Sequence, residues 1–281
     1  MKKRIWIPAA VLTALVLPGF YAGLTVRHYE IQSEKISHPV RIAHLSDLHS
    51  CRYGNAQEKL LRAIHEEAPD VIVMTGDMFD DKRDDQETAY LVQGLSGRYP
   101  CYYVTGNHEY WAGKEKFSKK MEILKANGVR ILHSETELLQ INGESLQIAG
   151  LDDPDKSLDF HYRRGLSSFQ GSLSKELSAL DRALDPDTFA LLLTHRPELF
   201  PLYRDTRFDL VLSGHAHGGQ WRLPFLQNGV YAPHQGFFPR YSGGLYREKG
   251  TTMIASRGLA RESTAVPRFY NPPELVIIDI K

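Results

Sequence analysis

The chain contains little cysteine and carries no net charge, and each shortage excludes a class of protein. Only two of its 281 residues are cysteines, Cys51 and Cys101, which excludes a disulfide framework and leaves the redox compartment open. The 34 Lys and Arg residues equal the 34 Asp and Glu residues, so no overall field attracts a polyanion, and no nucleic-acid partner is expected. Repeats and low-complexity tracts are also missing, and 42% hydrophobic with 24% charged residues is typical of a globular protein.

Long apolar runs are missing as well, except at the amino terminus. Three basic residues there precede 22 uncharged residues from Ile5 to Val26, which is long enough to cross a bilayer as a helix. We therefore predict a single-pass anchor over residues 1–27 in the cell membrane. A cleaved signal segment is one alternative, although a cut after Ala22 would place Phe20 where a small residue is preferred, and a buried helix is another.

The side of the membrane on which the rest of the chain lies is only weakly indicated. Basic residues occur on both sides of the apolar run, at residues 2–4 before it and at Arg27, Lys35 and Arg41 after it. The tighter cluster at residues 2–4 favours an inside amino terminus, and so an extracytoplasmic position for the residues that follow.

After a polar, linker-like stretch at residues 28–39, the sequence predicts one domain over residues 40–281. Short apolar runs rich in β-branched and aromatic residues are typical of buried strands: RIAHLS, DVIVMTG, CYYVTG, LQIAG, FALLLTH, DLVLSG, TTMIAS and ELVIIDI. Two stretches between them have helical spacing, AQEKLLRAIHEEA and KEKFSKKMEILKANG. Strands that alternate with helices predict a layered α/β domain.

Five of the strand-like runs are followed by side chains that can bind a divalent metal. In chain order these are Asp47, His49, Asp77, Asn107, His195, His215 and His217. Singly, each is more typical of a turn, a helix cap or a surface residue. Their recurrence favours a shared site, because ligands bind at the carboxyl ends of strands in α/β sheets. Histidines without this context, His234 among them, are interpreted as structural or surface residues.

The stretch LSGHAHGGQ places His215 and His217 on either side of Ala216, with glycines around the pair. In an extended segment, residues two positions apart point the same way, so both imidazoles could face one site. The flanking glycines would let the backbone approach a metal closely.

In this order, the motifs DLH, GD, GNHE, TH and GHAH resemble the five signature blocks of the calcineurin-like metallophosphoesterase family. The match runs from about Arg41 to the carboxyl terminus. The closing stretches YAPHQGFFPRYSGGLYREKGTTMIASRGLA and RFYNPPELVIIDI also resemble a membrane-associated bacterial branch of that family. The resemblance implies a four-layer α-β-β-α sandwich of two mixed sheets, with two metals at one edge.

The family pattern, carried over residue by residue, implies two divalent metal sites that share one ligand. The sets are Asp47, His49 and His217 for one metal, Asn107, His195 and His215 for the other, and Asp77 for both. His108 would meet the leaving-group oxygen as a general acid or a cationic stabiliser. Mixed nitrogen and oxygen ligands suit Mn²⁺, Fe or Zn²⁺.

The reaction implied is hydrolysis of a phosphodiester or pyrophosphate bond by in-line attack of a hydroxide that bridges two metals. A membrane anchor would suit a lipid-linked substrate such as UDP-2,3-diacylglucosamine. The alternatives are a phosphomonoesterase or protein phosphatase, which use the same core, and a non-catalytic metal-binding scaffold at the membrane, which would have no use for His108.

The stretch from Gly229 to Tyr246 is rich in aromatic residues and follows the last metal motif. Aromatic side chains with basic neighbours suit a bilayer interface, so this stretch could form a loop that faces the substrate or the membrane. The favoured alternative is a packed hairpin of the second sheet.

Overall fold

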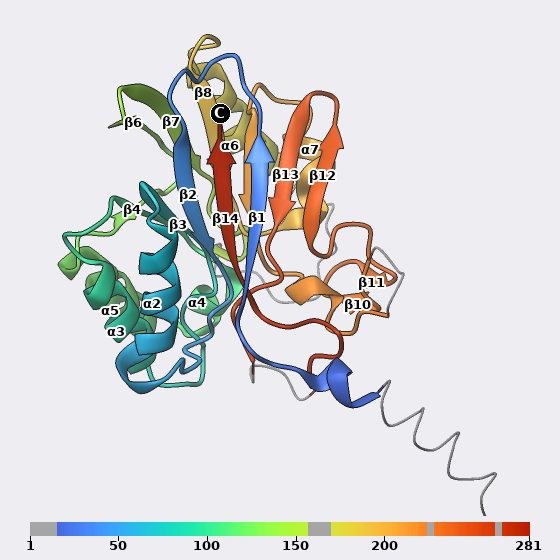
Figure 1. Ribbon diagram of the computed structural model, residues 1–281. Helices are drawn as coiled ribbons and strands as arrows, with labels where there is room; N and C mark the ends of the chain where they lie inside the picture. Colours follow the sequence, from blue (N-terminus) through green and yellow to red (C-terminus); the bar gives the residue numbers. More distant parts are fainter. Residues whose placement is uncertain (1–15, 157–169, 224–227, 262–265) are drawn as a thin grey trace, which may run out of the picture.

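Two packed β-sheets lie between helices in the computed structural model of the chain (Figure 1). The structure describes residues 16–156, 170–223, 228–261 and 266–281. The strand order is β1-β14-β2-β3-β4-β5 in the first sheet and β12-β13-β9-β8-β7-β6 in the second. Both sheets mix parallel and antiparallel pairs, because β14 is antiparallel to β2, and β6 is antiparallel to β7. The predicted α/β architecture of two mixed sheets is confirmed.

All eight predicted strands are present, and six more in the described ranges complete the sheets and one hairpin. The first sheet contains β1 (Thr25–Ile31), β2 (Val40–Leu45), β3 (Val71–Thr75), β4 (Cys101–Val104), β5 (Arg130–Ile131) and β14 (Glu274–Ile280). The second contains β6 (Thr136–Ile141), β7 (Glu144–Gly150), β8 (Phe189–Leu193), β9 (Leu210–Ser213), β12 (Gly244–Glu248) and β13 (Thr251–Ala255). A separate hairpin pairs β10 (Tyr231–Ala232) with β11 (Gly236–Phe237).

Helices cover the outer face of each sheet. Those described are α2 (Glu58–Glu67), α3 (Gln86–Leu95), α4 (Asn107–Trp111), α5 (Lys114–Ala126), α6 (Gln170–Ala183) and α7 (Phe200–Tyr203). Short 3-10 turns are η1 (Leu17–Phe20), η2 (Asn55–Gln57), η3 (Pro154–Lys156), η5 (Pro197–Leu199) and η6 (His217–Gly219). The two predicted helices correspond to α2 and α5.

Three apolar clusters separate the layers. Val73 belongs to the cluster between the sheets, Leu60 to the one under α2, α3 and α5, and Leu177 to the one under α6 and α7. Most strands are therefore buried on both faces, which is why they are continuous apolar runs in the sequence. Cys51 and Cys101 lie in the helix-side cluster of the first sheet as buried free cysteines.

The amino-terminal part differs from the expected linker, because β1 runs parallel to β14 from Thr25 beside Glu274 to Ile31 beside Ile280. Residues 28–31 of that expected linker therefore belong to the first sheet. Side chains along β1 alternate between half-buried and exposed, as expected of an edge strand. Such a strand carries no continuous apolar run, so its residues lack the pattern that predicts a buried strand.

The expected anchor is described only from residue 16 onward. In that part, Leu17–Phe20 form η1 and Val26 lies in β1, so a single helix running to Val26 is wrong. Residues 1–15 lie outside the described ranges. A bilayer-crossing helix, which needs about 20 mostly apolar residues, is absent from the described ranges.

Candidate metal centre

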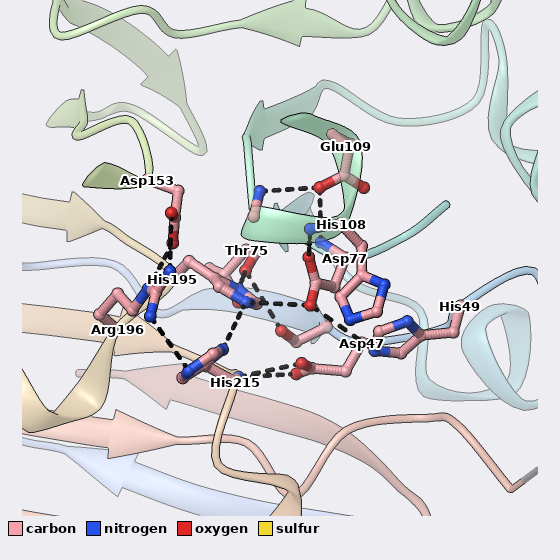
Figure 2. Close-up of polar contacts among 12 residues, drawn as sticks. Asp47, His49, Thr75, Asp77, His108, Glu109, Asp153, His195, Arg196 and His215 are labelled. Atoms are coloured by element: carbon pink, nitrogen blue, oxygen red, sulfur yellow. Dashed lines mark hydrogen bonds and ion pairs between the residues drawn. The ribbon is translucent and has the colours of Figure 1, made fainter. Parts of the chain in front are cut away.

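Six of the seven side chains predicted as metal ligands have donor atoms close to one another, and Figure 2 shows five of them. Each belongs to a loop, or to the first residue of a helix, just beyond the carboxyl end of a strand. Asp47 and His49 follow β2, Asp77 follows β3, Asn107 begins α4 after β4, His195 follows β8, and His215 and His217 follow β9. Residues from both sheets therefore contribute to the same cluster.

The first group consists of Asp47, His49 and His217, whose donor atoms lie within 4.8 Å of one another. Nε2 of His49 lies 3.3 Å from Nε2 of His217. Nε2 of His217 lies in turn 3.4 Å from Oδ1 of Asp47. Nδ1 of His49 faces Asp80 at 3.5 Å, which leaves Nε2 directed into the cluster. Buried imidazole nitrogens and a carboxylate at this spacing fit a divalent transition metal.

The second group consists of Asp77, His195 and His215. Nε2 of His195 lies 3.2 Å from Oδ2 of Asp77 and 3.2 Å from Nδ1 of His215. Nδ1 of His195 donates to the carbonyl of Thr75 at 2.7 Å, which fixes the ring with Nε2 towards the cluster. Oδ1 of Asn107 is buried without a hydrogen-bond partner, as suits an oxygen ligand.

Asp77 lies between the two groups. Its Oδ2 is 3.2 Å from Nε2 of His195 and 3.6 Å from Nε2 of His49. Its Oδ1 accepts the backbone N–H of His108 at 2.9 Å, which orients the carboxylate. One carboxylate shared in this way is what a pair of neighbouring cations requires.

Electrostatics in the cluster favour cations. Burial opposes ionisation of Asp77, but the charge of His195 holds its pKa well below the usual range. Burial alone would lower the pKa of His195, but Asp77 outweighs it and raises that pKa to about 10. Burial lowers the pKa values of His215 and His217 well below the usual range. A cation held by His195 would displace its proton, because a ligand nitrogen must be deprotonated.

The backbone of the cluster is strained. Asp47, His49, Asp77, His215 and His217 all have positive φ angles, between 46° and 64°. A non-glycine residue in this left-handed region costs on the order of 1 kcal/mol, so such residues concentrate where function requires them. The extended geometry predicted for the GHAH segment is wrong, because Ala216 is right-handed helical between two left-handed histidines. His215 and His217 consequently serve different groups.

Two glycines allow the loops to approach. A Cβ on Gly106 would lie 2.2 Å from Oδ1 of Asp77, and one on Gly214 would lie 1.9 Å from Oγ of Ser46 and 2.3 Å from Oδ2 of Asp47. Any side chain at either position would displace a predicted metal ligand. The glycines of GNHE and GHAH are thus required by close approach of the backbone.

His108 lies at the opening of the cluster, where its side chain is 24% exposed while that of His49 is 2% exposed. Its ring meets the His49 ring edge-on, with centroids 4.5 Å apart. Nδ1 of His108 lies 2.8 Å from Oδ1 of Asp81, so this carboxylate orients the ring. Asp81 is not among the predicted site residues, although it follows the GD motif by four residues.

Glu109 was also missed. Its carboxylate is fully buried and accepts three backbone N–H groups, from Asp77 at 3.0 Å, Phe79 at 3.1 Å and Gly106 at 2.8 Å. Burial, followed by the charge of Asp77, raises the pKa of Glu109, and the N–H donors oppose that rise. One side chain thereby joins the loop after β3 to the loop after β4.

A further set of side chains, which includes Arg196 and Asp153, lies beside His215 (Figure 2). Arg196 makes a buried two-point ion pair with Asp153, at 2.7 and 3.0 Å. Nη1 of Arg196 lies 2.8 Å from Nδ1 of His234, and the same nitrogen of His234 lies 3.1 Å from Nε2 of His215. His234 had been interpreted as structural or surface, because no strand-like run precedes it.

The group formed by Glu198, His215 and His234 also has the spacing of a metal site. Nη1 of Arg196 lies 3.8 Å from Glu198 and within 3.4 Å of a ring nitrogen of each histidine. The guanidinium therefore occupies the position that a third cation would need. This group belongs to the support of His215.

The sequence profile of the calcineurin-like phosphoesterase family matches residues 40–219, which contain all of the predicted ligands. The chain belongs to the calcineurin-like phosphoesterase family. Divalent metals are used throughout this family, in agreement with the two groups of donor atoms.

Relatives of this calcineurin-like phosphoesterase include bacterial proteins named as uncharacterized metallophosphoesterases. One from Aquifex aeolicus is 32% identical over 95% of this chain and 97% of its own length. YkuE of Bacillus subtilis is 28% identical over 90% of this chain and 84% of its own. YkoQ of Bacillus subtilis is 32% identical over 66% of this chain, and the match covers 64% of the length of YkoQ.

Solved structures agree on the fold of this calcineurin-like phosphoesterase. TT1561 of Thermus thermophilus has a TM-score of 0.51 at 15% identity, over 80% of this chain and 92% of that one. A 5'-nucleotidase precursor from the same organism has a TM-score of 0.50 at 16% identity, over 80% of this chain and 50% of that one. At such low identity the likeness shows the fold alone.

Proposed function

We propose that this chain is a dinuclear-metal hydrolase of phosphodiester or pyrophosphate bonds. The observation that supports it most strongly is the position of Asp77, whose one carboxylate oxygen lies near an imidazole of each group. In this proposal the first group holds one metal and the second group, with Asn107, holds the other. Two such ions would lower the pKa of a water and stabilise the charge that develops on the phosphoryl oxygens.

The protein's own groups complete the reaction in this proposal. His108, held by Asp81, stands at the opening and gives a proton or a positive charge to the leaving oxygen. The buried carboxylates and imidazoles exclude bulk water from the opposite side. Mixed nitrogen and oxygen donors favour Mn²⁺, Fe or Zn²⁺ over Mg²⁺ alone, and Mn²⁺ is the metal we would load first.

The test is turnover of bis-p-nitrophenyl phosphate and p-nitrophenyl phosphate by protein stripped with a chelator and then reloaded with Mn²⁺. We expect metal-dependent cleavage of the diester, with His108→Ala reducing turnover about 100-fold or more while two metals per chain remain bound. His65→Ala is the matched control, because His65 lies on α2 and contacts Tyr99. Cleavage of the monoester alone would favour a phosphomonoesterase, and two bound metals without cleavage of either ester would favour a scaffold.

We also propose that the protein is held at the cell membrane by its amino-terminal segment, with the metal centre outside the cytoplasm. This proposal is supported by the uncharged residues 5–16, which continue into η1 after the basic residues 2–4. Protease digestion of intact spheroplasts should degrade a carboxyl-terminal tag while a cytoplasmic marker survives. Recovery of the full-length protein in the soluble fraction would contradict membrane attachment, and a protected tag would contradict the topology.

A further inference from the structure

Exposed apolar side chains gather on one part of the surface. Of the thirteen large hydrophobic residues that are exposed in the described ranges, nine lie in or beside η1, the segment after η6 and the β10–β11 hairpin. We call these nine the apolar rim: Leu17, Phe20, Tyr21, Trp221, Leu223, Tyr231, Phe237, Phe238 and Val266. Single exposed hydrophobics are normal on a soluble protein, but a concentration of them marks an interaction surface.

Contacts join the segments of the rim into one surface. The ring of Phe269 lies 5.1 Å from that of Phe20 and 5.5 Å from that of Trp221. The backbone N–H of Val230 donates to the carbonyl of Trp221 at 2.7 Å, and that of Phe238 donates to the carbonyl of Val230 at 2.8 Å. Figure 1 accordingly shows η1 and the β10–β11 hairpin on the same side of the molecule.

The rim borders the metal centre. Trp221 follows the ligand His217 by four residues, and Nδ2 of Asn271 donates to the carbonyl of His217 at 2.7 Å. His234, which contacts the ligand His215, occupies the turn of the hairpin that carries Phe237. The rim and the candidate ligands His215 and His217 are therefore joined through the same loops.

We propose that the apolar rim inserts into a lipid bilayer and presents the metal centre to phosphate esters in lipid head groups. A bilayer is favoured as the occupant because the uncharged residues 5–16 enter the described structure at Leu17, which is itself part of the rim. Aromatic and aliphatic side chains on one face are what an interfacial surface uses. The head-group substrate rests on the proposed phosphoesterase function, whereas the insertion does not.

The structure divides the aromatic stretch from Gly229 to Tyr246 into a packed part and an exposed part. Strand β12 packs in the second sheet and Tyr241 is buried against Phe200, as the packed-hairpin alternative requires. Phe237 and Phe238, however, are 74% and 71% exposed; Phe237 ends β11 of a separate two-stranded sheet, and Phe238 follows it directly. Only residues 231–238 of the stretch therefore contribute to the rim.

Insertion is tested by tryptophan fluorescence in vesicles of phosphatidylcholine and phosphatidylglycerol that carry brominated acyl chains. The full chain has three tryptophans, so Trp6→Phe with Trp111→Phe leaves Trp221 as the only emitter. The matched control replaces all three with Phe and adds Leu138→Trp, because Leu138 is 60% exposed on β6, outside the rim. We expect bromine to quench Trp221 at least about twofold more than the tryptophan at position 138. Equal quenching at both positions would overturn the proposal.

A second measurement removes the most exposed rim side chains. Phe237→Ser with Phe238→Ser should lower kcat/KM for a vesicle-borne phosphodiester about tenfold while leaving kcat/KM for bis-p-nitrophenyl phosphate unchanged. Tyr90→Ser with Leu138→Ser, at exposed sites outside the rim, should change neither value. If no variant cleaves either ester, the proposed function fails, but the quenching still decides insertion. A dimer that the Phe237 and Phe238 substitutions convert to a monomer, with Trp221 unquenched, would identify the rim as a protein interface and refute insertion.

Discussion

Removal of the Glu109 carboxylate is predicted to separate the two loops that carry Asp77 and Asn107. The carboxylate accepts the backbone N–H groups of Asp77, Phe79 and Gly106, and all of these atoms are buried. In Glu109→Ala the three donors lose their acceptor. Each buried donor left unpaired costs about 1–2 kcal/mol when water can partly enter, so the expected loss of unfolding free energy is about 3–6 kcal/mol.

Glu109→Gln provides a graded comparison. Its remaining oxygen can still accept from Asp77 and Gly106, which share Oε2 of Glu109, but an NH₂ group replaces the acceptor of the Phe79 N–H. One donor is then unpaired, and the expected loss is about 1–2 kcal/mol. The free energy of unfolding should therefore decrease from wild type to Glu109→Gln and again to Glu109→Ala.

Urea unfolding of chelator-treated protein near neutral pH would measure these losses, and titration with Mn²⁺ would measure metal affinity. Glu122→Ala on the exposed face of α5 is the control and should stay within about 0.5 kcal/mol of wild type. Metal affinity should fall with stability in the Glu109 variants, because the displaced loop carries Asn107. A Glu109→Ala protein as stable as the control would refute the idea that this carboxylate holds the loops together.

Three further predictions concern side chains around the centre. His234→Ala should weaken binding of one metal about 10- to 100-fold in calorimetry, because Nε2 of His215 loses its ring-nitrogen partner, whereas His234→Asn should retain part of the affinity. Asp81→Asn should reduce turnover about tenfold with unchanged metal content, because His108 loses its orienting carboxylate; unchanged turnover would be inconsistent with that role. Burial lowers the pKa of His44 to about 3 in the folded state from the ordinary 6.5, so the unfolded state binds the extra proton first. Stability should therefore fall as the pH drops below 6.5, and chelator-treated His44→Gln should lose about 1.4 kcal/mol less per pH unit than wild type in urea unfolding.

The sequence predicted the sheets and the clustered donor side chains for the same physical reason. Strands buried on both faces are continuous apolar runs, and a functional side chain at the end of such a run is conspicuous. Asp47 after RIAHLS and His195 after FALLLTH are examples. Strand β1 was missed because it is an edge strand, half exposed, whose place is set by pairing with β14 at the other end of the chain.

The residues that support the ligands have no comparable local signal. His234 lies in a hairpin turn, preceded by only two strand residues, and it reaches His215 because β10 and β11 fold back beside η6. Arg196 and Asp153 are 43 residues apart in the chain, and only the parallel pairing of β7 with β8 places the loops after them side by side. Contacts of this kind follow from the assembled sheets, so neither residue type nor spacing predicts them.

Backbone strain explains why the candidate ligands depend on the residues that support them. Five of the predicted ligands have left-handed backbones, a conformation that their own residue types disfavour by on the order of 1 kcal/mol each. Such strain persists only when the surroundings supply compensating bonds, and here Glu109 accepts the backbone N–H of Asp77 while Asp47 accepts that of His215. The candidate ligands carry the family motifs, and the supporting groups hold these side chains in position. Loss of a supporting group should therefore weaken metal binding even when every ligand is intact, which is the result expected for Glu109→Ala.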